Sequence, residues 1–168
     1  IKLFDTVPGG FIPQQDKQYL VAIAQLPDAS SLDRTEDVLA QMQQIALEVP
    51  GVAHTVAFPG LSVNGFTNSP NSGIVFTPLE SFDKRTDPSQ SAMAIAAELN
   101  KRFAAIDEAF VAVFPPPPIQ GLGTTGGFKL QIEDRANKGF EALFNSLQAV
   151  IGKAQQDPAL MGLYSSFR

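Results

Sequence analysis

Residues 110–134 read FVAVFPPPPIQGLGTTGGFKLQIED, and this stretch decides how the chain is divided. A strand-like run at 110–114 meets four consecutive prolines, and a second alternating run at 128–132 follows a glycine-rich loop. Because proline cannot donate a backbone hydrogen bond to a sheet, residues 115–118 end the first run and form a stiff, extended connection. The sequence therefore predicts two structural units joined by a Pro/Gly-rich crossing at 115–127.

The segment before the prolines carries alternating and helical apolar patterns in a definite order. Its first strand is apolar on both faces, as a central strand should be, and each helix shows one apolar face. The predicted order is strand (19–26), helix (ending near Val49), strand (52–58), loop (59–72), strand (73–79), helix (from Asp87) and strand (110–114). This is the split βαβ or ferredoxin-like pattern, an α+β fold in which both helices cover one face of an antiparallel four-stranded sheet.

The segment after the crossing begins the same pattern again. Phe128, Leu130 and Ile132 alternate with polar residues as a half-buried strand, and an amphipathic helix follows between Phe140 and Ala154. Residues 163–167 resemble the start of another strand. The segment 128–168 is therefore predicted to be the first half of a second, similar subdomain. Because its strands lack partners, we expect it to pack on the first subdomain or on another copy.

Composition and charge exclude several classes of function. The net charge is −5, and the 12 lysines and arginines do not cluster, whereas nucleic-acid binding and basic membrane-surface binding both need clustered cations. The absence of cysteine excludes disulfides and thiolate metal sites within the chain. No apolar run approaches the roughly 20 residues that a membrane helix needs.

No pattern in the chain predicts catalysis. Residues 121–126 match G-x-G-x-x-G, but they lie between prolines and a strand, whereas dinucleotide binding needs this loop between a strand and a helix. His54 is the single histidine and has no nucleophile or acid at catalytic spacing. Neighbouring carboxylates at Glu133 and Asp134 would point to opposite faces of a strand. We therefore expect no enzymatic activity, metal or cofactor.

The predicted loop at 59–72 carries apolar side chains among glycines and asparagines. Leu61, Val63 and Phe66 either tuck into the domain or contact a ligand, and the sequence pattern leaves both interpretations open.

Several short motifs together resemble the resistance-nodulation-division (RND) multidrug efflux pumps, which are proton-driven transporters of the Gram-negative inner membrane. They are Phe11-Ile-Pro13 with Asp16, Gln25-Leu-Pro27, Asn71-Ser-Gly-Ile-Val-Phe76, and the proline and glycine crossing up to Phe128. The resemblance covers essentially the whole chain. It implies a fragment of the second large periplasmic loop, with residues 1–16 as a linker from the membrane part, 17–114 as the first porter subdomain and 128–168 as the opening half of the next.

The resemblance also implies residue roles and partners. Substrates, expected to be amphiphilic drugs, would contact Ile23, Leu61, Val63, Phe66, Phe76, Phe128, Leu130 and Ile132. A switch loop between an outer and an inner pocket would include Gly60, Gly65, Asn68 and Asn71. In the intact pump the expected partners are two further copies in a homotrimer, a periplasmic adaptor protein and an outer-membrane channel.

A different class of function is the alternative. A stand-alone ferredoxin-like domain could sense a ligand or dock a protein through its apolar loop. Flanking gene sequence distinguishes the two hypotheses, because a pump requires membrane helices on both sides of this segment.

Overall fold

A computed structural model of the chain describes residues 15–63, 67–116, 130–158, 160 and 165. The chain divides into two compact units, Ile1–Gly127 and Phe128–Arg168. The first contains β1 (Tyr19–Gln25), α1 (Leu32–Leu47), β2 (Val56–Leu61), β3 (Asn68–Pro78), a short 3-10 helix η1 (Pro88–Gln90), α2 (Ala92–Phe103) and β4 (Phe110–Phe114), and the second contains α3 (Phe140–Ala154).

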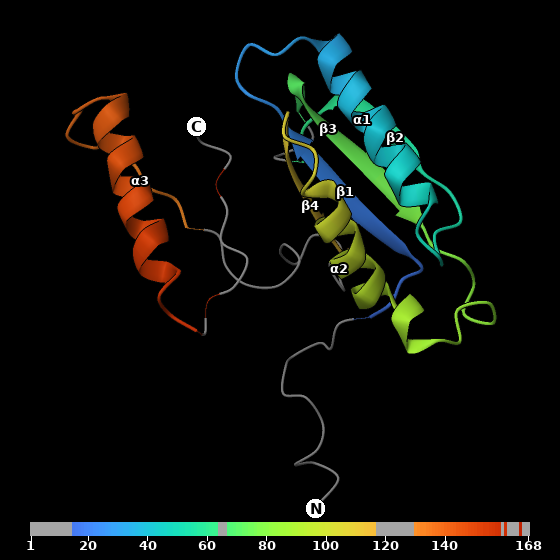
Figure 1. Ribbon diagram of the computed structural model, residues 1–168. Helices are drawn as coiled ribbons and strands as arrows, with labels where there is room; N and C mark the ends of the chain where they lie inside the picture. The colour runs from blue at the N-terminus through green and yellow to red at the C-terminus, as the bar shows by residue number, and fades with distance from the viewer. Residues whose placement is uncertain (1–14, 64–66, 117–129, 159, 161–164, 166–168) are drawn as a thin grey trace, which may run out of the picture. The chain divides into compact units, whose positions relative to one another are not determined.

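The four strands of the first unit form one antiparallel sheet in the order β2-β3-β1-β4. Helices α1 and α2 lie side by side on one face of this sheet (Figure 1). Strand β1 is central, as its two-sided apolar character predicts. The predicted α+β split βαβ fold is therefore confirmed.

The hydrophobic core lies between the helices and the sheet. Both helices begin after a serine cap, where the Ser31 and Ser91 hydroxyls accept hydrogen bonds from the backbone N–H groups of Arg34 and Ala94. Core side chains include Leu20, Ala22 and Ala24 of β1, Val38, Leu39, Met42 and Ala46 of α1, Val75 of β3, Ile95, Ala96, Leu99 and Phe103 of α2, and Val113 of β4. The even-numbered residues of β1 thus face the helices, and its odd-numbered residues face the other way.

Strand β2 begins at Val56, so the predicted start at Val52 is wrong. Val52 forms only an isolated bridge with Leu79. The N–H groups of Ala53 and His54 both donate to the carbonyl oxygen of Pro78, at 2.9 and 3.3 Å. Because two amides share one acceptor, no regular ladder forms before Val56.

The hairpin between β2 and β3 is also longer than predicted. Gly60, Asn68 and Asn71 lie in strands rather than in a loop at 59–72. Gly60 has a φ of +75° and lies at an irregularity between Pro59 and Leu61, after which Leu61 pairs with Asn68. A glycine permits this backbone turn within a strand, so the pairing continues further than the Gly- and Asn-rich sequence suggests.

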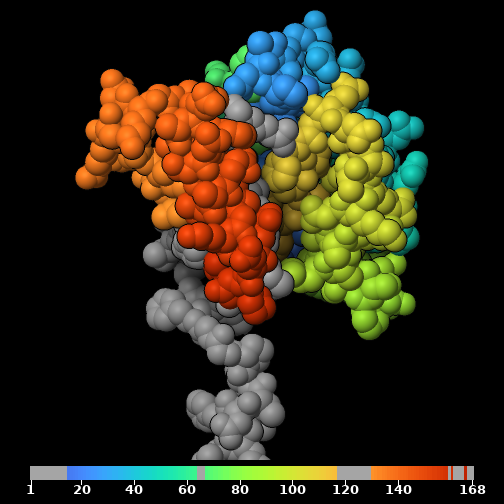
Figure 2. All heavy atoms as spheres, turned by 60° about the vertical axis from the view of Figure 1, so that its left-hand side comes forward, coloured from blue at the N-terminus to red at the C-terminus, as the bar shows by residue number. Residues whose placement is uncertain are grey.

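The second unit is described chiefly by α3. The predicted helix is confirmed, but none of its residues is buried, and Figure 2 shows its side chains, coloured orange to red, open on the visible face. The predicted strand at 128–132 is wrong where it is described, because residues 130–134 form no strand. Within the described part of this unit no strand is present that could pair with residues 130–134. Most of the predicted strand at 163–167 lies outside the described residues.

Candidate functional site

Part of the sheet face that turns away from α1 and α2 is apolar across all four strands. Cross-strand pairing places the side chains of this apolar part in two rows that run from β2 through β3 and β1 to β4. The first row is Phe58, Ile74, Ile23 and Ala112, and the second row is Val56, Phe76, Val21 and Phe114. We call these eight residues the apolar sheet face.

Aromatic contacts hold the middle of the apolar sheet face in place. The rings of Phe58 and Phe76 meet edge to face, with centroids 5.7 Å apart and an interplanar angle of 89°. The Tyr19 ring lies 6.5 Å from that of Phe76 at a tilted angle of 45°. Such tilted and perpendicular arrangements are the ones that aromatic rings favour. Phe76 is therefore positioned by a ring on either side of it.

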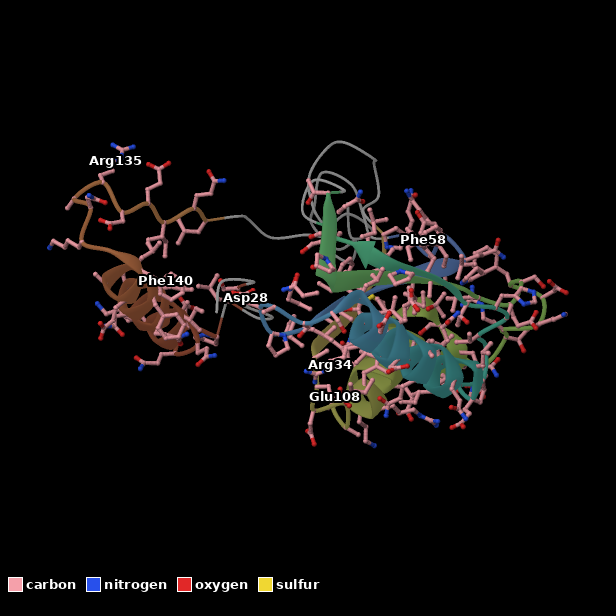
Figure 3. All side chains as sticks on the ribbon, turned by 90° about the horizontal axis from the view of Figure 1, so that it is seen from above. Asp28, Arg34, Phe58, Glu108, Arg135 and Phe140 are labelled. Atoms are coloured by element: carbon pink, nitrogen blue, oxygen red, sulfur yellow. The ribbon has the colours of Figure 1, made fainter. Side chains whose placement is uncertain are left out.

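The most accessible part of the apolar sheet face lies at the β2 edge. Ile74 and Ile23 are 1% and 6% exposed, whereas Val56 and Phe58 are 47% and 43% exposed. Figure 3 shows Phe58 on the opposite side of the sheet from Arg34 and Glu108, which form an ion pair beside the helices. A molecule that binds this face would therefore meet Val56 and Phe58 first.

A polar network ties β3 to the end of β1 at Asn71. The side-chain amide of Asn71 donates to the carbonyl oxygen of Leu26 at 3.3 Å, and its oxygen accepts a hydrogen bond from Ser69 at 2.6 Å. Gln25 of β1 donates to the Asn71 carbonyl oxygen at 3.2 Å. Asn71 therefore anchors β3 to the end of β1.

The structure brings two of the predicted substrate-binding residues together. Ile23 and Phe76 both lie on the apolar sheet face, in neighbouring rows. Leu61 ends β2 and Val63 follows it, and both are half-buried. In the second unit, Leu130 is 60% exposed and Ile132 is half-buried, without the strand that was predicted to carry them. Gly65, Phe66 and Phe128 lie outside the described residues.

Sequence reasoning missed Val56 and Phe58 as candidate binding residues. Their alternation marks one face of a strand, but the pattern does not tell which face the helices cover. That information comes from the register, because Val56 pairs with Phe76 and Phe58 pairs with Ile74. They could have been found by combining this alternation with the knowledge that the odd-numbered residues of β1 face away from the helices.

The most buried charged side chain of the described residues supports the fold rather than a site. Arg85 donates from Nη1 and Nη2 to both carboxylate oxygens of Asp16, at 3.0 and 3.2 Å, and also bonds the carbonyl oxygens of Glu80 and Gln90. Burial raises the pKa of Asp16, but hydrogen bonds from Arg85, from the Gln18 and Ala92 amides and the Arg85 charge outweigh it, so the pKa lies below its ordinary value.

An open groove of about 360 Å³ lies on the helix side of the sheet, between the end of α1 and α2. Its charged groups already pair with each other, since Nε of Arg102 lies 2.8 Å from Oε1 of Glu98. Its walls include Val49 and Ile95, which belong to the core. The groove therefore offers a ligand little free polar chemistry, and the apolar sheet face is the stronger candidate.

The described residues carry no group of three side chains that could hold a metal ion. No helix in the described ranges is long and apolar enough to cross a membrane. What the apolar sheet face can do chemically is bind apolar surface, because it presents hydrocarbon and aromatic groups without acids, bases or nucleophiles among its eight residues.

Comparisons with known proteins show the family to which the chain belongs. The sequence model of the AcrB/AcrD/AcrF family matches residues 1–168. The chain is 32% identical over 163 residues to the multidrug/solvent efflux pump membrane transporter MepB of Pseudomonas putida, covering 95% of this chain and 15% of that protein. It is 30% identical to the multidrug export protein AcrF of Escherichia coli and 29% identical to the toluene efflux pump membrane transporter TtgE of Pseudomonas putida, covering 95% and 94% of this chain. The chain spans 15% of the length of each of these relatives, and it belongs to the AcrB/AcrD/AcrF family of RND efflux transporters.

Proposed function

We propose that the apolar sheet face is one wall of a substrate-binding site in an efflux transporter. The observation that carries this proposal is the pair of four-residue apolar rows, open to solvent at Val56 and Phe58. Apolar attraction has no preferred direction, so such a wall accepts substrates of varied structure. Amphiphilic drugs and organic solvents are the substrate classes that this surface suits best.

The binding free energy available from Val56 and Phe58 is too small for this wall to form the whole site. Val56 and Phe58 are each about half exposed, and completing their burial would give about 1 kcal/mol per side chain. Micromolar affinity requires about 8 kcal/mol, in addition to the cost of association. The proposed binding site therefore has a second wall, which other parts of the full-length transporter supply. This segment alone should bind substrates weakly.

The proposed location and partners follow from family membership. We place this segment in the periplasmic part of a Gram-negative inner-membrane pump that is driven by protons and assembles as a trimer with an adaptor protein and an outer-membrane channel. Its own contribution is binding rather than chemical conversion. The family match along the whole chain favours this function over a stand-alone ligand-sensing or docking domain.

The test is a resistance profile of the full-length transporter with Phe58→Ala, in a host that lacks other pumps. Losing about 1 kcal/mol of binding weakens affinity about five-fold, so susceptibility should change for some drugs or solvents at unchanged expression. The matched control is Leu47→Ala, since Leu47 is 54% exposed but lies on α1. An unchanged profile for Phe58→Ala, or an equal change in the control, would contradict the proposal.

A further inference from the structure

The outer edge of β4 can be assigned from the hydrogen-bond register. Leu79 donates to the Gln18 carbonyl oxygen and Leu26 donates to that of Asn71, both at 2.8 Å. Even-numbered positions along β1 therefore bond towards β3, because hydrogen-bonded pairs alternate along an antiparallel ladder. The odd-numbered positions of β1 bond towards β4.

This alternation determines which groups of β4 point away from the sheet. The odd positions of β1 pair with Phe110, Ala112 and Phe114. Val111 and Val113 lie between them, so their N–H and C=O groups point outwards. Strand β4 is an edge strand in the described part of the chain. These two residues would offer a neighbouring strand two donors and two acceptors.

A side chain of α2 already occupies one of these positions. Nδ2 of Asn100 donates to the Val113 carbonyl oxygen at 2.8 Å, and the Val113 N–H donates to Oδ1 of Asn100 at 2.9 Å. Nδ2 also donates to the carbonyl oxygen of Ala96, one turn back in the helix, at 2.9 Å. A carboxamide carries the same donor and acceptor as a peptide group. Asn100 thus bonds Val113 as a partner strand would, and we call this arrangement the Asn100 clasp.

The sequence of β4 indicates that, without Asn100, a second copy of β4 could pair with its outer edge. Residues 110–114 read FVAVF, which is the same in both directions. Two copies placed antiparallel about Ala112 would set Val111 of each opposite Val113 of the other. Both pairs would be of the hydrogen-bonded kind, and Phe110 would face Phe114 across the junction. Such a contact is self-complementary, as a two-fold symmetric interface must be.

The opposite edge of the sheet is protected by different means. Strand β2 contains Pro59, which has no N–H to donate, and Gly60, where the pairing with β3 becomes irregular. Strand β4 has neither a proline nor an irregularity within 110–114.

We propose that the Asn100 clasp prevents two copies of this chain from joining through β4. The carboxamide satisfies Val113 within its own molecule and leaves Val111 as a single outward position, too short for a ladder. Removing the carboxamide should expose a five-residue, palindromic edge to a second copy.

The test compares Asn100→Ala with Lys101→Ala, its neighbour on the exposed side of α2, by sedimentation velocity and by amide hydrogen exchange. In the wild-type chain the Val113 amide should exchange at least about ten-fold more slowly than the Val111 amide, because only Val113 is hydrogen-bonded. Asn100→Ala should self-associate at least about ten-fold more tightly than the wild type and than Lys101→Ala, with Val111 and Val113 both protected in the associated form.

A second variant tests where the association occurs. Adding Val111→Pro to Asn100→Ala removes an outward N–H, which an edge strand tolerates, and should abolish the new association. Unchanged self-association of Asn100→Ala, or association without protection of Val111, would overturn the proposal. If Asn100→Ala does not fold, the wild-type exchange rates decide, and equal rates for Val111 and Val113 would overturn it.

Discussion

Leu39 of α1 packs directly over Gly73 of β3. A Cβ atom added to Gly73 would lie 2.5 Å from Cδ1 and 2.7 Å from Cδ2 of Leu39, and Leu39 is itself buried. Gly73→Ala should therefore destabilise the chain by about 2 kcal/mol through overpacking, measured by urea unfolding. Combined with Leu39→Val, which shortens the opposing side chain, the loss should be smaller than the sum of the two single losses. Additive losses would show that these residues do not compete for space.

Replacing either of two buried threonines with valine should change the stability of the chain, but in opposite directions. The Thr77 hydroxyl has no hydrogen-bond partner among the described residues, so Thr77→Val should raise stability by about 1 kcal/mol. The Thr35 hydroxyl donates to the carbonyl oxygen of Pro70 at 2.6 Å, so Thr35→Val should lower stability by about 2 kcal/mol. Thermal unfolding of both variants checks the prediction, and a destabilised Thr77→Val would show that its hydroxyl is paired.

The Asp16 and Arg85 pair should make stability depend on pH. The pKa of Asp16 is lower in the folded chain than its ordinary value of 3.8, so its contribution is present above 3.8 and is lost as the pH falls through the folded pKa. Asp16→Asn should cost up to about 3 kcal/mol at pH 7, because it leaves the buried Arg85 without its counter-ion.

The corresponding measurement is urea unfolding of both proteins between pH 7 and pH 2. The difference between wild type and Asp16→Asn should shrink towards zero at the acid end. Asp37→Asn, at an exposed position of α1, serves as the control and should follow the wild-type curve. A constant difference at every pH would contradict the assigned role of the Asp16 charge.

Phe66 and Phe128 remain predicted substrate contacts through the family resemblance. Replacing either with alanine in the full-length transporter should change the drug-resistance profile without lowering expression, because each replacement would remove aromatic surface from the predicted binding site. Resistance to several drug classes and immunoblots of membrane fractions check this. Unchanged susceptibility across those classes would exclude both assignments.

Long, strongly periodic segments of the fold could be predicted from the sequence. The helices and β1 follow apolar patterns that local sequence largely determines. The start of β2 could not be predicted, because apolar and polar residues still alternate through Val52 and His54. In the structure, Val52 forms only a single bridge to Leu79, and the His54 N–H bonds to the carbonyl oxygen of Pro78 at the end of β3. The length of the hairpin could not be predicted either. The Gly- and Asn-rich composition indicates a loop, whereas the strands continue to pair past an irregularity at Gly60.

The candidate site was only partly predictable for a related reason. Ile23 and Phe76 came from the family resemblance, whereas Val56 and Phe58 depend on the register between strands that lie far apart in sequence. Alternation at Phe128, Leu130 and Ile132 predicts a strand, but a strand also needs a neighbour, and local sequence does not supply one. Pairing between strands therefore determines which residues line the candidate site and whether an alternating segment becomes a strand.

The most direct test of the apolar sheet face as a substrate wall uses the absence of cysteine from this chain. Phe58→Cys and, as control, Leu47→Cys are introduced into a full-length transporter that lacks other reactive cysteines, and labelling by a thiol reagent is timed with and without a transported drug. We predict that the drug slows labelling at position 58 and leaves position 47 unchanged. Equal labelling rates at position 58 with and without drug, for every transported compound tried, would contradict the account.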